Sequence, residues 1–187
     1  MVVAVAGLVA IVAIALFFGR AGDAFGTLND ASLLVMTLAL APVMAGFYEL
    51  GGRAPLTPAR ASLAAGIAAV LAWSAVQALL LLGAVQFAYD QPARGAFAVE
   101  AVAVAIIGLW IAGADLLAGP WLPLRVRWGG ILTGVGFVVF GAGLLLGGAF
   151  HLFTIIGGVP YQLLLPLWAF RLVGVFRSES LARAGGT

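Results

Sequence analysis

The sequence predicts an all-α integral membrane protein, folded as one bundle of six transmembrane helices with both termini in the cytoplasm. Hydrophobic residues make up 64% of its 187 residues and charged residues 9%, whereas about 25% of a soluble domain is charged. The apolar residues form runs of about 20, the length that crosses a bilayer as a helix. These runs lack strand-like alternation, which excludes a transmembrane barrel.

The first helix is predicted over residues 2–18. No basic residue precedes this run, and it exceeds the roughly 7–15 apolar residues of a secretory signal core. We therefore expect a retained helix.

The second helix is predicted over 31–50, preceded by FGTLNDAS, where Thr27 and Asp30 have the spacing of a capping box that starts a helix. The alternative function of Asp30 is a polar site at the external face.

The remaining helices are predicted over 61–89, 96–118, 130–149 and 159–176, which makes residues 1–187 a single transmembrane domain. The turn between the last two carries no charge. Glycine pairs bound it, and Pro160 suits the first turn of a helix. Without this turn the chain would have five crossings, and the C-terminus would lie on the opposite side.

Arginines predict the orientation in the cell membrane. Seven of the nine basic residues follow or end even-numbered helices, and two, Arg20 and Arg94, follow odd-numbered ones. The positive-inside rule then places both termini, 51–60 and 119–129 in the cytoplasm, and 19–30, 90–95 and 148–158 outside. Trp121 and Trp128 fit an aromatic belt at the inner surface.

Glycines in the fifth run have the small-xxx-small spacing that lets membrane helices approach closely. Close packing within one subunit is the favoured interpretation. Self-association, or contact with other membrane subunits, is the alternative for the same four residues: Gly130, Gly134, Gly143 and Gly147. Besides membrane lipids we expect no nucleic acid as a partner, because the arginines form no single basic stripe.

Composition excludes several kinds of chemistry. The chain has no cysteine, so thiolate metal sites and cysteine nucleophiles are absent, and no lysine, so a Schiff base is absent. His151, the one histidine, cannot form a multi-histidine zinc site, and the simpler account is an interfacial histidine. Walker, HExxH and GxSxG motifs are missing. No catalytic residue, metal or cofactor is therefore predicted, bound lipid excepted.

Polar residues in or near the apolar runs are the ligand-binding candidates, because an ionisable group at membrane depth is functional by default. They form three groups. The outer group is Asp30, Glu100 and His151, the central pair is Ser74 and Gln77, and the inner group is Glu49, Asp115 and Arg171. The inner group predicts either a polar vestibule or an interhelical ion pair with Arg171. The central pair predicts a hydrogen bond across helices, or a ligand contact.

Four segments together resemble a group of small, uncharacterised bacterial six-helix membrane proteins: FGTLNDA, ALAPVMAGFYEL, IIGLWIAGADLL and LLLPLWAFRL. The resemblance covers most of the chain. It implies the six-helix fold and carries no assigned activity or catalytic residues.

The favoured functional hypothesis is a non-enzymatic membrane protein that binds lipid or another hydrophobic molecule, or serves as an accessory subunit of a larger complex. The first alternative is a small transporter or proton-coupled carrier, with the inner and outer polar groups as gates. The second is a membrane-embedded enzyme acting on a lipid, with His151 or a carboxylate as acid or base.

Overall fold

The computed structural model describes residues 1–19, 22–50, 56–118 and 121–184, and this part of the chain holds helices without strands. The prediction of an all-helical fold with six helices is confirmed. They are α1 Val2–Phe18, α2 Asp23–Leu50, α3 Leu56–Leu81, α4 Ala96–Leu117, α5 Leu124–Gly147 and α6 Leu152–Ala184. Arg20 and Arg53, which the orientation prediction uses, lie outside the described residues.

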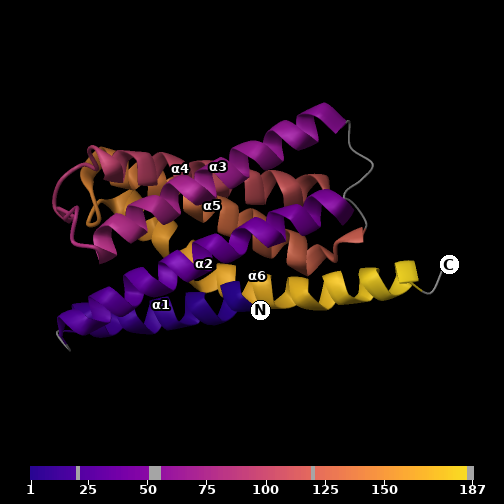
Figure 1. The fold of residues 1–187 in the computed structure, drawn as a ribbon, viewed down its shortest axis with the longest axis horizontal. Coiled ribbons are helices and arrows are strands. Elements are labelled where there is room, and N and C mark those ends of the chain that lie inside the picture. The colour runs from indigo at the N-terminus through magenta and orange to yellow at the C-terminus, as the bar shows by residue number, and fades with distance from the viewer. Residues whose placement is uncertain (20–21, 51–55, 119–120, 185–187) are drawn as a thin grey trace.

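Consecutive helices run back and forth between two ends of an elongated bundle (Figure 1). At one end, called here the Tyr89 end, short connections join α1 to α2 and α5 to α6, and residues 82–95 join α3 to α4. The opposite end, called the Arg127 end, holds the α2–α3 and α4–α5 connections and the C-terminus. The most extensive helix contacts are those of α5 with α4 and α6.

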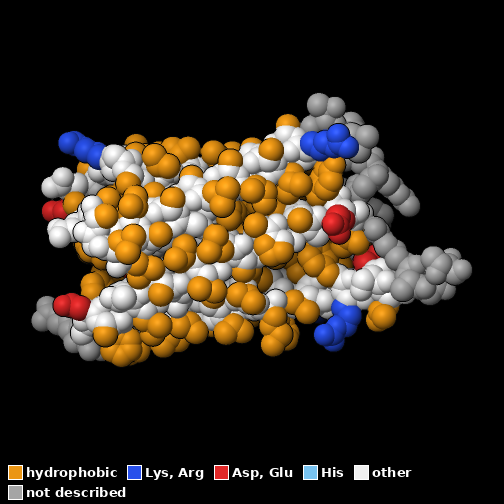
Figure 2. Space-filling model, in the orientation of Figure 1, with side chains coloured by type: hydrophobic (Ala, Val, Ile, Leu, Met, Phe, Trp, Pro, Cys, Tyr) orange, Lys and Arg blue, Asp and Glu red, His pale blue; other side chains and the backbone are white. Residues whose placement is uncertain are grey.

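Five helices, α2 to α6, are long and apolar enough to cross a membrane, while α1 is apolar but has 17 residues. Hydrophobic side chains cover the visible face between the two ends, and the charged side chains gather at those ends (Figure 2). An uncharged band of this kind matches the hydrocarbon core of a bilayer. The fold is therefore compatible with a multi-pass membrane protein.

The second helix begins earlier than predicted, at Asp23, directly after Gly22 in the left-handed region with φ 121°. FGTLNDAS is therefore helical, and the predicted capping box is wrong. Thr27 is exposed within the helix, and Asn29 Nδ2 donates to Asp30 Oδ1 at 3.2 Å. Asp23 occupies the first turn instead, where a carboxylate is favoured by the helix dipole.

The third helix ends at Leu81, eight residues before its predicted end at 89. Gly83, with φ 69°, ends it in a Schellman motif. The Gly83 N–H donates to the Leu80 carbonyl, and the Ala84 N–H donates to the Leu79 carbonyl. Ser74 and Gln77 consequently lie near the Tyr89 end of α3 and not in the middle of a long span.

The fifth and sixth helices also begin earlier than predicted, at Leu124 and Leu152. Arg127, in the first turns of α5, donates from Nε to the Asp115 carbonyl at 3.2 Å and from Nη2 to the Leu116 carbonyl at 3.3 Å. A cation there compensates the negative end of α4. Pro160 lies inside α6, so the expectation that it marks the helix start is wrong.

Candidate functional site

A buried polar cluster joins α3 to α4 near the Tyr89 end. Glu100 is 9% exposed, and its Oε1 accepts two hydrogen bonds, from Trp73 Nε1 at 2.9 Å and from Gln77 Nε2 at 2.8 Å. Trp73 and Gln77 are four residues apart, so they lie on one face of α3. The predicted hydrogen bond of Gln77 across helices is confirmed, and its partner is the outer candidate Glu100.

Two polar atoms of α3 have no hydrogen-bond partner among the described residues. They are Gln77 Oε1 and the Ser74 hydroxyl oxygen, and their residues are 2% and 6% exposed. Buried polar atoms in proteins are nearly always paired, so each such atom calls for an explanation. Gln77 Oε1 can only accept a hydrogen bond, whereas the Ser74 hydroxyl can accept or donate one.

Three further titratable groups are linked to this cluster by the electric field of a carboxylate. The carboxylate of Asp30, on α2, interacts electrostatically with Glu100 and also with Tyr89 in the 82–95 connection. Tyr161, on α6, interacts with Glu100 as well. Burial raises the pKa of the Tyr89 phenol above its usual range, and the charge of Asp30 raises it further. The Tyr89 phenol therefore keeps its proton at neutral pH.

A second buried carboxylate, Asp115, lies at the Arg127 end of α4. It is fully buried, and its Oδ1 accepts a hydrogen bond from Trp168 Nε1 of α6 at 3.2 Å. Its Oδ2 is buried without a partner among the described residues. A Cβ at Gly130 would collide with Oδ2, so the glycine gives this carboxylate its space.

Aromatic side chains pack around the Asp115 end of the core. The Phe47 ring lies 5.8 Å from Trp110, 5.5 Å from Trp121 and 6.0 Å from Trp168 between ring centroids. Trp121 therefore faces the core, whereas Trp128 is 56% exposed. Of these two residues, Trp128 alone has the exposure that the predicted aromatic belt requires.

The inner group is not joined by contacts among the described residues. Glu49 and Arg171 are both exposed, and neither forms a hydrogen bond with Asp115, whose side chain bonds to Trp168 instead. The predicted ion pair with Arg171 is therefore not formed. An indole N–H satisfies part of a buried carboxylate without bringing a second charge into the core.

His151 lies in the short turn before α6. Its Nδ1 accepts a hydrogen bond from the Phe153 N–H at 3.3 Å, and its ring packs edge-on against Phe153 at 5.3 Å. Within the described residues it bonds to no carboxylate, and no group of three metal-ligating side chains occurs there. The geometry around His151 thus brings no acid or base partner to it.

The glycines of α5 contact other parts of the same chain. A Cβ at Gly134 would meet Gly108 and Ala112 of α4, and one at Gly143 would meet Thr154 of α6. A Cβ at Gly147 would meet His151. Together with Gly130, these residues allow α5 to pack closely against both of its neighbours.

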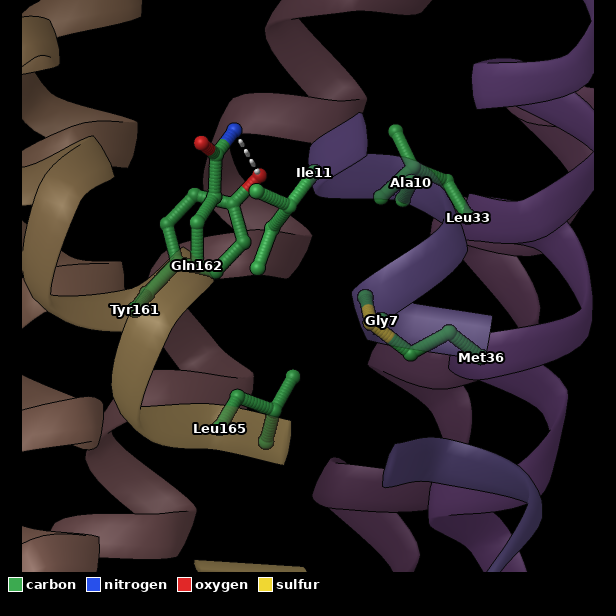
Figure 3. Close-up of a pocket in the computed structure, with 8 residues that line it drawn as sticks. All are labelled: Gly7, Ala10, Ile11, Leu33, Met36, Tyr161, Gln162 and Leu165. Atoms are coloured by element: carbon green, nitrogen blue, oxygen red, sulfur yellow. Dashed lines mark hydrogen bonds between the residues drawn. The ribbon is translucent and has the colours of Figure 1, made fainter. Parts of the chain in front are cut away.

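A small cavity lies between α1, α2 and α6 (Figure 3). Its volume is about 10 Å³, roughly the space of a single water molecule. Gln162 Nε2 donates to the Tyr161 hydroxyl at its edge, at 3.4 Å. The other residues drawn there are apolar, so this cavity is too small and too apolar for a larger ligand.

A larger groove lies on the surface between α1 and α2. Its volume is about 300 Å³, at the lower end of the range for small-molecule sites. Its lining is entirely apolar: Leu8, Val9, Val12, Ala13, Leu16, Phe25 and Leu28. Most of these side chains, including Leu8 and Val12, are more than one-third exposed. The groove can therefore hold an apolar chain.

The sequence did not single out Trp73, Trp168 or the groove. Both tryptophans sit in apolar runs, where an aromatic residue is ordinarily a packing residue, and the i, i+4 spacing of Trp73 and Gln77 was the one available signal. The groove depends on how α1 packs against α2, and no local sequence pattern predicts that packing.

No protein-family model, curated protein or solved structure matches the chain.

Proposed function

We propose that the chain is a six-helix, non-enzymatic protein of the bacterial cell membrane, with both termini cytoplasmic, that binds the acyl chain of a membrane lipid in the α1–α2 groove. The groove itself carries the proposal. Most of its lining side chains are exposed at the surface, and all seven lining residues are apolar. A polar ligand would find no hydrogen-bonding side chain there, whereas a hydrocarbon chain needs none.

The groove also has a defined position along the bundle. Phe25 and Leu28 lie in the first turns of α2, and Leu16 lies in the last turn of α1. These are the turns nearest the Tyr89 end, so a lipid of the leaflet at that end would place its chain in the groove and its head group near the α1–α2 connection. Under the proposed orientation this is the outer leaflet.

Filling the groove should displace the bound lipid. We expect that Val12→Trp lowers the amount of lipid that co-purifies in mild detergent, because the larger side chain occupies the groove. Val12 is 59% exposed, so the substitution does not overpack the core. Native mass spectrometry of the purified protein measures the bound lipid.

The matched control for this prediction is Leu109→Trp on α4, since Leu109 is 64% exposed and lies away from the groove. It should retain the lipid of the wild-type protein. If Val12→Trp and wild type carried the same lipid in the same amount, the groove would not be the binding site. If a protein partner co-purified in place of lipid, the accessory-subunit function would replace this proposal.

Cysteine labelling tests the proposed orientation, because the chain has no native cysteine. Asp90→Cys and Ser180→Cys each place one thiol on an exposed position, the first at the Tyr89 end and the second near the C-terminus. In intact cells an impermeant maleimide should label the first variant, and it should label the second after permeabilisation. Labelling in the reverse order would overturn the orientation.

A further inference from the structure

We propose that Glu100 is a proton-binding site that exchanges its proton with the aqueous phase at the Tyr89 end by way of Asp30. The observation behind this is a buried carboxylate that accepts from two neutral donors, one of which, Gln77, also has a buried acceptor without a donor. This activity goes beyond the lipid binding proposed above and uses a different part of the molecule.

Glu100 has no cationic partner within the described residues. Its two hydrogen bonds come from an indole and an amide. The charge of Asp30 of α2 acts on Glu100, and the charge of Glu100 acts in turn on Tyr161 of α6. The parts of α1, α3 and α5 near the Tyr89 end contain no ionisable residue. An ionised carboxylate without a cation is costly at membrane depth, and a bound proton removes that charge.

The Gln77 amide is complementary to a protonated carboxyl group. Its Nε2 already donates to Glu100 Oε1 at 2.8 Å, while its Oε1 is buried and unpartnered. A carboxylate can only accept hydrogen bonds, but a protonated carboxyl also donates one O–H. Protonation of Glu100 therefore supplies a donor for the unused acceptor of the Gln77 amide.

The neighbouring groups lead from this cluster toward one end of the bundle. Asp30 is partly buried in the second turn of α2, and Glu100 lies in the second turn of α4, so both carboxylates are near the Tyr89 end. Tyr89 is 39% exposed in the 82–95 connection. Toward the opposite end, the buried face of α4 continues with Val104, Ile107 and Ile111, all 0% exposed. A proton leaving Glu100 thus has a titratable neighbour on the Tyr89 side and an apolar barrier on the other.

Infrared difference spectroscopy of the full chain in lipid nanodiscs tests the assignment. Between acidic and alkaline buffer we expect a band of a protonated carboxyl group that Glu100→Gln abolishes and Asp115→Asn retains. The glutamine keeps the volume of the side chain and an acceptor for Trp73, so folding is preserved. The same band in Glu100→Gln as in the wild type would overturn the proposal.

Tryptophan fluorescence gives a second readout, because Trp73 donates directly to Glu100. The pH-dependent part of the emission should be lost in both Trp73→Phe and Glu100→Gln and kept in Trp168→Phe.

Asp30→Asn tests the route of the proton. This variant should slow hydrogen–deuterium exchange of the Glu100 carboxyl without removing its infrared band. Exchange as fast as in the wild type would show that the proton does not pass by way of Asp30.

Discussion

Replacing Gly134 by alanine should destabilise the bundle by about 1–3 kcal/mol, the usual cost of overpacking. The added methyl group would contact the Gly108 carbonyl oxygen, and it would lie 2.7 Å from the Ala112 nitrogen and 2.9 Å from the Ala112 Cβ. Two of these atoms belong to the α4 backbone and cannot rotate away, so α4 and α5 would have to separate. Denaturant unfolding in detergent micelles, followed by circular dichroism, measures the loss.

Gly113→Ala is the matched control, because Gly113 also lies in the α4–α5 hairpin but a Cβ there has nothing within 4 Å. Alanine is the better helix former by about 1 kcal/mol, so this variant should be as stable as the wild type or more so. Equal destabilisation of Gly134→Ala and Gly113→Ala would contradict the packing argument. Whether each variant is more or less stable than the wild type is therefore more informative than the size of the change in its free energy of unfolding.

Helix number was predictable from this sequence because apolar runs of about 20 residues, divided by glycine, proline and charged residues, are typical of helices that can cross a bilayer. The bounds of α1 and α4 were predicted within a residue, since their runs end at glycine or at charged loops. Helix starts were less predictable. Asp23 and Arg125 are polar, yet a first turn accepts such residues, because its side chains can reach the bundle end and its backbone N–H groups need no partner in the helix.

The candidate residues were predictable one by one, but their partners were not. Polarity alone marks Glu100, Gln77 and Asp115 within apolar surroundings. A helical spacing shows which residues share a face, but it does not show which helix that face contacts. The sequence therefore grouped Asp115 with Arg171 by depth, whereas packing places the Trp168 indole against it. Long, flexible arginines reach the surface, which is why Arg171 is exposed.

Replacing Asp115 by alanine should cost about 1–3 kcal/mol more than replacing it by asparagine. Alanine leaves the buried N–H of Trp168 without its acceptor, whereas asparagine keeps an oxygen near the position of Oδ1, 3.2 Å from that nitrogen. Asparagine also removes the ionisable group, so a small cost for this variant means that the hydrogen bond, and not the charge, joins α4 to α6. Denaturant unfolding of both variants measures the difference.

A double-mutant cycle with Trp168→Phe separates this bond from the general effect of changing a core residue. Phenylalanine removes the N–H and keeps much of the ring, which is buried with 2% exposure against Phe47. If the bond stabilises the bundle, Asp115→Ala should cost less in the Trp168→Phe background, with a coupling energy of about 0.5–3 kcal/mol. Additive costs would mean that Asp115 does not stabilise the α4–α6 contact. The unpartnered Oδ2 and the space left by Gly130 would then point to a functional role for this carboxylate, because neither feature would serve packing.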